Sequence, residues 1–421
     1  MLQAALVYSV IATLLFLGAV ALAAVVFALK RGGRREDSSE DRVGLASSRF
    51  TIPVSIIVPL TGDSSAGGPA AKEFFAALLT LHYPEYEVIV VADEQHAGLE
   101  ALKSEWDLAA HEYFYRKSLE TAEVRRIYRS NRQSRLLVIE KRAAGRADAM
   151  NCGVNLARYR YVTSVDADIR FDADALLRAM AAPLRDPAAA VGATSVVERR
   201  DGSALQLGAI RSLMLSRMAL THGIAAPVAH DAVTVWRRDA ILQLGGFSAT
   251  AADADFDMAI RVQTSPTLTG GVVQTPEIFG HIPARPRQDV RYVAARRQRA
   301  ALQAVGHLLT AGASARRGLA PVLGSAIVIP LAQLWAVVAS VAAASAGWLA
   351  WRDAVLVVVL LSLGRGIVSS GALLMRGAAA GAPDGASLMR LLLFAPIESV
   401  VTGPAAAIGR ATGAWFFAKR P

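Results

Sequence analysis

The sequence predicts an α/β domain with membrane-spanning helices at both ends of the chain. Between residues 51 and 285, short apolar runs rich in β-branched residues alternate with helical segments. This alternation is typical of a parallel sheet with crossover helices. Near both ends of the 421-residue chain lie apolar runs with few or no charges, and they are long enough to cross a bilayer.

The amino-acid composition limits the cellular compartments and the classes of binding partner that are expected for this chain. Hydrophobic residues make up 53% of the chain, which is more than an ordinary soluble enzyme contains. The single cysteine, Cys152, excludes an internal disulfide framework and suits a reducing compartment. Much of the net charge of +10 comes from arginine clusters beside hydrophobic segments, which favours anionic lipids and phosphates as partners. The sequence lacks the interleaved aromatic and basic residues that are typical of nucleic-acid-binding proteins, so no nucleic-acid partner is expected.

The first apolar run, Met1–Leu29, contains no charged residue, so residues 1–29 are predicted to form a transmembrane anchor. A cleaved signal peptide is the alternative, but it carries its positive charge before the apolar run. Here Lys30, Arg31 and Arg34 follow the run. By the positive-inside rule, the domain that follows is predicted to lie in the cytoplasm. The expected location of the chain is the plasma membrane. Residues 30–50 are polar and are predicted to form a linker.

The α/β domain is expected over residues 51–285. The expected strands are Thr51–Leu60, Tyr86–Val91, Leu136–Ile139, Tyr161–Val165, Ala190–Val197 and Ala232–Trp236. The expected helices are Lys72–Leu81, Ala147–Ala157, Ala173–Leu184, Ala204–His222 and Asp239–Leu244, the last stopped by two glycines. The charged segment Leu99–Arg132 is expected to be mostly helical.

Two carboxylates, Asp166 and Asp168, follow the strand Tyr161–Val165 directly. In open α/β sheets, ligands bind at the carboxyl edge of the strands. Two carboxylates one residue apart suit a hard divalent cation, which can hold the phosphates of a nucleotide. An ordinary surface turn is the alternative interpretation of so short a pattern.

A second acidic group, Asp253, Asp255 and Asp257, opens a helix expected to end near Gln263. Acidic residues at the start of a helix complement its dipole, so capping is the alternative to a chemical role for each of them.

The carboxy-terminal part is predicted to meet the membrane. Residues 286–312 are basic with amphipathic spacing over Val290–Leu309, which predicts an interfacial helix on the lipid surface. Residues 318–415 are predicted to hold two spans, Gly318–Trp351 and Val355–Leu374, and a third apolar run, Leu391–Ile408. The third run contains Pro396 and Pro404 and can be a span, a kinked span or a re-entrant segment. Arg365 and Glu398 either pair inside the bundle, face a cavity or snorkel to the edge of the membrane.

Several stretches together resemble the membrane-embedded family 2 glycosyltransferases, the group that includes poly-N-acetylglucosamine, hyaluronan and cellulose synthases and ceramide glucosyltransferases. The resemblance runs from Val54 to about Gln303. It depends on Ser-Ile-Ile-Val-Pro, Tyr-Pro-Glu-Tyr-Glu-Val-Ile-Val-Val-Ala-Asp, Gly-Arg-Ala-Asp-Ala-Met-Asn, Val-Asp-Ala-Asp and Arg-Arg-Asp-Ala-Ile-Leu-Gln-Leu-Gly-Gly-Phe. It implies a GT-A fold, which is a Rossmann-like sheet that binds nucleotide sugars, and so agrees with the α/β prediction.

The resemblance also implies roles for the residues that bind the donor. Asp93 would hydrogen-bond the uracil or ribose, and Asp63 would present a carboxylate to the nucleotide. Lys141 and Arg146 would lie near the nucleotide or its diphosphate, where cations offset the negative charge.

For the chemical step, the resemblance implies that Asp166 contacts the donor sugar or ribose. Asp168 would bind a divalent cation, Mg²⁺ or Mn²⁺, that bridges the diphosphate. Asp255 would be the base that removes the proton from the acceptor hydroxyl in an inverting displacement.

The chain departs from the family pattern in three places. Ala254 stands where a glutamate normally precedes the base, and Arg146 stands where the family has a lysine. The Gln-x-x-Arg-Trp motif near the acceptor channel is eroded: Arg296 keeps a cation for the diphosphate, but Arg297 takes the place of the acceptor-stacking tryptophan. In a shifted register these two positions fall on Arg299 and Ala300, which also provide no aromatic ring.

The leading hypothesis is therefore an inverting, metal-dependent glycosyltransferase that uses a nucleotide sugar, expected to be a UDP-sugar, at the cytoplasmic membrane face. Its expected acceptor is a lipid or lipid-linked glycan. A processive polysaccharide synthase is one alternative, and the eroded motif argues against it. A catalytically impaired relative that binds a nucleotide sugar or a partner synthase is the other.

Overall fold

The computed structural model describes residues 2–32, 51–62, 69–94, 96–167, 169–188, 190–196, 198–199, 232–274, 280–282, 300, 303 and 328–380. The chain divides into two compact units, which are described separately below. One unit comprises Asp37–Asp201 and Pro227–Ala284, and the other comprises Met1–Glu36, Gly202–Ala226 and Arg285–Pro421.

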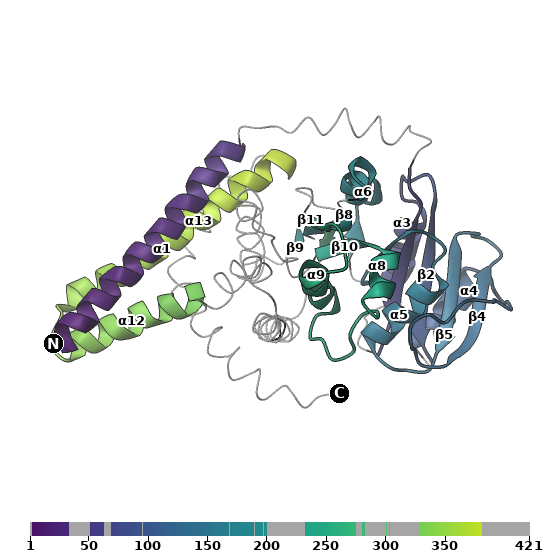
Figure 1. Cartoon of the computed structure of the whole chain (residues 1–421), viewed down its shortest axis with the longest axis horizontal. Coiled ribbons are helices and arrows are strands. Elements are labelled where there is room, and N and C mark those ends of the chain that lie inside the picture. The colour runs from purple at the N-terminus through teal and green to yellow at the C-terminus, as the bar shows by residue number, and fades with distance from the viewer. Residues whose placement is uncertain are drawn as a thin grey trace. The chain divides into compact units, whose positions relative to one another are not determined.

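The first unit is built on a nine-stranded sheet of order β11-β8-β10-β6-β1-β2-β5-β4-β3 (Figure 1). Its strands are β1 Val54–Leu60, β2 Tyr86–Asp93, β3 Leu108–Ala110, β4 Val124–Ser130, β5 Leu136–Lys141, β6 Tyr161–Ser164, β8 Ala190–Val196, β10 Ala232–Arg237 and β11 Gly271–Gln274. The central strands β6, β1, β2 and β5 are parallel. A smaller sheet joins β7 Arg170–Phe171, β12 Gly280–Ile282 and β9 Glu198–Arg199.

Helices cover both faces of the large sheet. They are α3 Pro69–Leu79, α4 Ala97–Glu105, α5 Arg146–Leu156, α6 Ala175–Arg185, α8 Arg238–Gln243 and α9 Ala254–Thr264. Strand β1 is buried along its whole length, with Ile56 packed in the core of α3 and α6 and Ile57 in the core of α5, α8 and α9. A central parallel strand is apolar on both faces for this reason. The result is a three-layer α/β domain.

The described strands and helices confirm the expected alternation, with two corrections. The sheet is not wholly parallel, because β10 runs antiparallel to both β6 and β8, and β4 runs antiparallel to β5. The expectation of a mostly helical Leu99–Arg132 is wrong, since α4 ends at Glu105 and β3 and β4 follow it. Strand β4 lies next to the edge strand and carries exposed arginines. Its sequence is therefore as rich in charged residues as that of a solvent-exposed helix. The expected helix Ala204–His222 lies outside the described residues, and so does Val290–Leu309 apart from Ala300 and Gln303.

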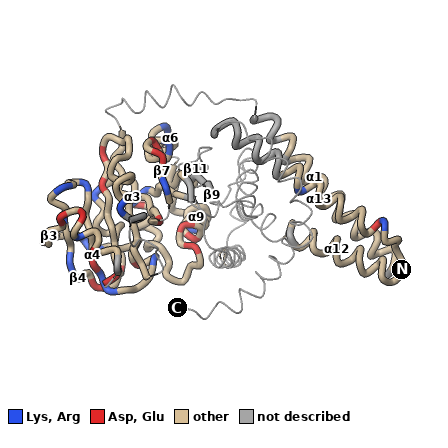
Figure 2. Tube along the Cα trace, turned by 180° about the vertical axis from the view of Figure 1, so that it is seen from behind, with Lys and Arg blue, Asp and Glu red and all other residues tan. Residues whose placement is uncertain are grey.

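The second unit contains α1 Leu2–Gly32, α12 Ile329–Ser345 and α13 Trp351–Ala380. Val10 of α1 packs with Ala336, Ala339 and Val357, and few charged residues appear along these helices (Figure 2). Arg365 donates to Gln333 Oε1 at 2.7 Å, so it has a polar partner within the unit. The proposed partner Glu398 lies outside the described residues.

Within the described part of the chain, one segment, Gln3–Ala23, is long and apolar enough to cross a membrane. Leu331–Ser345 is a shorter apolar helix. The amino-terminal anchor is thus compatible with the structure, whereas the carboxy-terminal spans remain a prediction.

Candidate active site

Two predicted site residues face each other at the carboxyl ends of neighbouring parallel strands. Asp93 ends β2 and is the register partner of Lys141, which ends β5. The Asp93 side chain is 9% exposed and the Lys141 side chain is 0% exposed. The two charged atoms, Lys141 Nζ and Asp93 Oδ1, are 3.5 Å apart. Burial raises the pKa of the Asp93 carboxyl, and the ammonium of Lys141 opposes that rise.

Three further predicted residues, Arg146, Asp166 and Asp255, lie close together. Arg146 is the first residue of α5, and its guanidinium lies between the other two side chains. Its Nη2 lies 3.1 Å from Oδ1 of Asp166, which follows β6, and 3.7 Å from Oδ2 of Asp255 in the first turn of α9. Its Nη1 lies 2.9 Å from Met150 Sδ. Three elements that are distant in sequence thereby place one cation between two carboxylates.

Asp255 is held by side chains of two strands of the sheet. Trp236 of β10 donates Nε1–H to Asp255 Oδ1 at 3.1 Å, and Ser164 of β6 donates its hydroxyl to Oδ2 at 3.3 Å. Burial raises the pKa of Asp255 to about 6, and Arg146 is the main influence that opposes this rise. The carboxylate is thus fixed in position and more basic than an ordinary aspartate.

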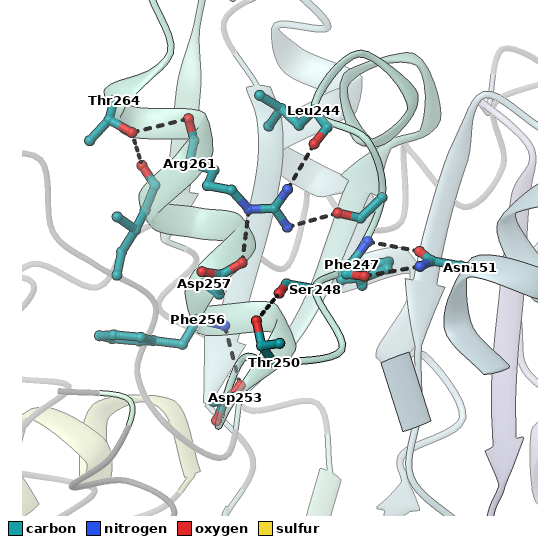
Figure 3. Close-up of polar contacts among 12 residues, drawn as sticks. Asn151, Leu244, Phe247, Ser248, Thr250, Asp253, Phe256, Asp257, Arg261 and Thr264 are labelled. Atoms are coloured by element: carbon teal, nitrogen blue, oxygen red, sulfur yellow. Dashed lines mark hydrogen bonds and ion pairs between the residues drawn. The ribbon is translucent and has the colours of Figure 1, made fainter. Parts of the chain in front are cut away.

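The three acidic residues at the start of α9 have separate tasks, and Figure 3 shows two of them, Asp253 and Asp257. Asp253 is the N-cap, because its Oδ1 accepts a hydrogen bond from Phe256 N at 3.2 Å. Asp257 Oδ2 accepts a hydrogen bond from Arg261 Nε at 2.8 Å. The capping alternative therefore holds for Asp253, while the carboxylate of Asp255 is directed to Trp236 and Ser164.

A polar network that sequence reasoning missed holds α9 in place (Figure 3). Arg261 donates to the carbonyl oxygens of Leu244 and Gly246, both at 2.8 Å. On the other side of the same turn, Asn151 of α5 donates to Phe247 O at 2.9 Å and accepts from Phe247 N at 2.7 Å. The turn thus links the helix that bears Arg146 to the helix that bears Asp255.

Glycine is required in that turn. Gly246 has φ +84°, and a Cβ at this position would lie 2.7 Å from Asn151 Oδ1. The Gly-Gly-Phe sequence and Asn151 stood in the stretches that carry the resemblance, which is the signal that could have pointed to this network. Nothing in the sequence marked Trp236 or Ser164 as neighbours of Asp255.

The remaining predicted site residues, Asp63, Asp168 and Arg296, lie outside the described residues. Among the residues that are described, no group of three or more histidine, cysteine, aspartate or glutamate side chains could hold a metal. Asp166, with a side chain 40% exposed, is available at the strand edge. Mg²⁺ commonly binds one or two carboxylates together with substrate phosphates. A carboxylate at this edge therefore fits a cation that is shared with a diphosphate.

Comparisons with known proteins agree with this architecture. The family described as Glycosyl transferase family 2 matches residues 117–244, a range that includes Lys141, Arg146 and Asp166. The structure is similar to the mannosyltransferase PcManGT from Pyrobaculum calidifontis in complex with GDP-Man and Mn²⁺, with 18% identity over 96% of this chain and 100% of that chain and a TM-score of 0.55. A further similar structure is S. aureus TarS 1-349, with 14% identity over 77% of this chain and 91% of that chain and a TM-score of 0.41. No curated protein matches the sequence.

At 18% identity, the similarity to the mannosyltransferase concerns the fold alone. The family match adds the domain, and it covers the turn before α5 and the strand that carries Asp166. The chain therefore carries a glycosyl transferase family 2 domain on a GT-A fold, and it is a glycosyltransferase.

Proposed function

We propose that the chain is an inverting, metal-dependent enzyme that transfers a sugar from a nucleotide-sugar donor to a lipid or lipid-linked acceptor. The observation that carries the proposal is the meeting of Arg146, Asp166 and Asp255, in which a buried carboxylate lies beside a cation and an exposed carboxylate. One group can act as a base, and the others can bind a diphosphate and the sugar or ribose attached to it.

Asp255 is the proposed base. In an inverting displacement, the acceptor hydroxyl attacks the anomeric carbon, its proton passes to the base, and the nucleoside diphosphate leaves from the opposite face. A pKa of about 6 leaves Asp255 ionised at pH 7 and makes it a better proton acceptor than an aspartate in water. Because Trp236 and Ser164 donate to both of its oxygens, the base is already oriented before the acceptor arrives.

The proposed donor site lies along the carboxyl edge of the sheet. Among the described residues, none makes a hydrogen bond to the buried Asp93 Oδ1, so it can accept an N–H of the nucleobase or a hydroxyl of the ribose. Asp166 would contact the donor sugar or ribose, and Arg146 would offset the charge of the diphosphate. Asp63 would complete the nucleotide site, and Arg296 would supply a second cation to the diphosphate.

A divalent cation, Mg²⁺ or Mn²⁺, is the proposed cofactor, with Asp168 as its protein ligand. When bound, it would stabilise the negative charge that develops on the departing diphosphate. The solved mannosyltransferase of similar fold is in complex with GDP-Man and Mn²⁺, which supports a nucleotide sugar and a divalent cation here. Uridine remains the nucleoside that we expect, and guanosine is the alternative to test beside it.

The proposed acceptor is a lipid at the cytoplasmic face of the plasma membrane. The apolar segment Gln3–Ala23 supports a membrane anchor, and the basic stretch within residues 286–312 suits an anionic lipid surface. Arg297 stands where polymer-forming relatives are expected to have a tryptophan, which favours transfer of one or a few sugars over polysaccharide synthesis.

Incubation of the purified full chain with labelled UDP- and GDP-sugars, Mn²⁺ and a membrane lipid extract tests the proposal. We expect label in a low-molecular-weight, lipid-soluble product, and its loss when the cation is chelated. A polymer of high molecular weight would contradict single transfer. If no donor is hydrolysed or transferred, the chain is a binding protein and the proposal is wrong.

A further inference from the structure

Lys141 is the most deeply buried cation among the described residues of the active-site region. Its side chain is 0% exposed, although lysine is almost never fully buried unless it is paired. Its Nζ lies 3.1 Å from Asp148 Oδ2 and 3.5 Å from Asp93 Oδ1, and it donates to the carbonyl oxygen of Arg142 at 2.8 Å. The ammonium is thus surrounded by acceptors of the protein itself.

Asp148 anchors this arrangement from the interior. Its Oδ1 and Oδ2 accept from the backbone N–H of Ala122 at 2.7 and 3.1 Å. An ammonium has three N–H groups, and Asp148 and the Arg142 carbonyl take two of them. The third is left for Asp93, which lies in register with Lys141 on the neighbouring strand.

Asp93 depends on that neighbour. Its Oδ1 is buried at the carboxyl edge of the sheet, and Lys141 Nζ is 3.5 Å away. A buried carboxylate that lacks a nearby cation tends to take up a proton. Lys141 is the largest of the influences that oppose the effect of burial on the Asp93 pKa, ahead of His96 and the backbone N–H of Gly62. An ionised Asp93 accepts hydrogen bonds only, which suits a nucleobase N–H or a ribose hydroxyl.

We propose that Lys141 is a positioning residue, which keeps the Asp93 carboxylate ionised and in place for the nucleoside part of the donor and does not contact the diphosphate. This inference rests on the proposed function. It differs from the role that the sequence suggested, in which Lys141 lies near the nucleotide or diphosphate, because its side chain is 0% exposed and its ammonium lies against Asp148, Asp93 and the Arg142 carbonyl. Arg146, which is partly exposed, remains the residue for the diphosphate.

Binding measurements on the full chain separate the two roles. The probes are UDP and GDP with Mn²⁺, titrated by calorimetry, and inorganic pyrophosphate with Mn²⁺ as a competitor. The variants are Lys141→Met, Asp93→Asn, the combination of both, and Arg146→Met. Arg142→Met is the matched control, because it removes an exposed positive charge one residue away.

If Lys141 acts through Asp93, Lys141→Met and Asp93→Asn should each weaken nucleoside diphosphate binding by about tenfold or more. Each substitution would weaken or remove the hydrogen bond from the nucleoside to the charged Asp93 carboxylate. The combined variant should bind no more weakly than the weaker single variant. Pyrophosphate should compete within about twofold of the wild type in Lys141→Met, and much less well in Arg146→Met.

Additive losses, or a weaker pyrophosphate competition in Lys141→Met, would overturn the inference and place Lys141 on the diphosphate. Since Lys141→Met leaves two carboxylates without their cation, Lys141→Met/Asp148→Asn serves if the single variant fails to fold, and the same pattern is expected from it. A wild-type chain that binds neither UDP nor GDP would overturn the proposed function itself, whereas normal wild-type binding with the wrong variant pattern overturns this inference alone.

Discussion

Trp236 and Asp255 are joined by a hydrogen bond of 3.1 Å between the indole Nε1–H and the carboxylate Oδ1. Trp236 is almost fully buried, so it can fix the carboxylate from within the sheet. The other oxygen, Oδ2, faces Ser164 and Arg146. The proposed base is therefore oriented by the core of the domain, and substitutions in the core should change the rate of the chemical step.

Gly192 of β8 should be one of the core positions that affect turnover. A Cβ at Gly192 would lie 2.6 Å from Cζ3 of Trp236, so Gly192→Ala must displace the indole. Loss of its hydrogen bond to Asp255 should lower turnover by about tenfold or more, with donor affinity nearly unchanged. Gly271→Ala in the neighbouring strand is the control, because a Cβ there meets nothing within 4 Å. Equal turnover in the two variants would show that the indole does not orient the base.

The pH dependence of transfer should follow the protonation of Asp255. Burial raises its pKa to about 6, and only the ionised form can accept a proton. Turnover should therefore rise as the pH increases through about 6 and level off above pH 7. The pH profile of kcat at saturating donor checks this, and a profile that is flat between pH 5 and 8 would contradict it.

Stability should change with pH in the opposite sense. The folded state holds the Asp255 proton more tightly than the unfolded chain, so the free energy of unfolding falls as the pH rises from about 4 to about 6. At pH 8 the ionised, buried carboxylate should cost about 3 kcal/mol. Asp255→Asn should thus raise the melting temperature at pH 8 more than at pH 4.

Arg261 should be important for the stability of the site's scaffold. Arg261→Met would remove three hydrogen bonds and leave Asp257 and the carbonyls of Leu244 and Gly246 without this partner. A loss of roughly 2–4 kcal/mol in the free energy of unfolding is expected from a mostly buried pair. Lys72→Met, which breaks an exposed pair with Glu105, should cost less than about 1 kcal/mol. Urea unfolding of both variants checks this, and equal losses would show that the network adds nothing to stability.

The topology of the chain can be tested with reporter fusions at Ser48 and Gly312. Because the positive charges follow the apolar run at the amino terminus, both positions should lie in the cytoplasm. A reporter active on the outer side at either position would separate the catalytic domain from cytosolic nucleotide sugars and would contradict the proposed location.

The sequence predicted the edge of the sheet that holds the site, because Asp93 and Asp166 both come at the ends of apolar strands. The apolar run Thr51–Leu60 is buried on both faces over Val54–Leu60, so its hydrophobic pattern does not by itself distinguish a strand from a buried helix. Its short length favours a strand. The many charged residues of Leu99–Arg132 led to the wrong prediction of a mostly helical segment. A strand near the edge of a sheet and a surface helix both expose arginine, so charge alone does not distinguish them.

Finer features depended on tertiary contacts. Asp253, Asp255 and Asp257 are all suited to capping, and only the residue at which α9 begins decides that Asp253 is the cap. The sequence does not show that Lys141 is buried, because its burial requires Asp93 and Asp148, which come from separate segments. The contact of Trp236 with Asp255 follows from the antiparallel placement of β10, which no local pattern in the sequence specifies.

The most direct test of this account compares transfer by Asp255→Asn with transfer by Asp253→Asn. Loss of a positioned base should lower turnover by about 10²–10⁴-fold in Asp255→Asn, while donor affinity and folding are retained. Asparagine is also a good N-cap, so Asp253→Asn should leave turnover and stability nearly unchanged. Turnover by Asp255→Asn at the wild-type rate, measured with a labelled nucleotide sugar at pH 7.5, would contradict the central claim that Asp255 is the base.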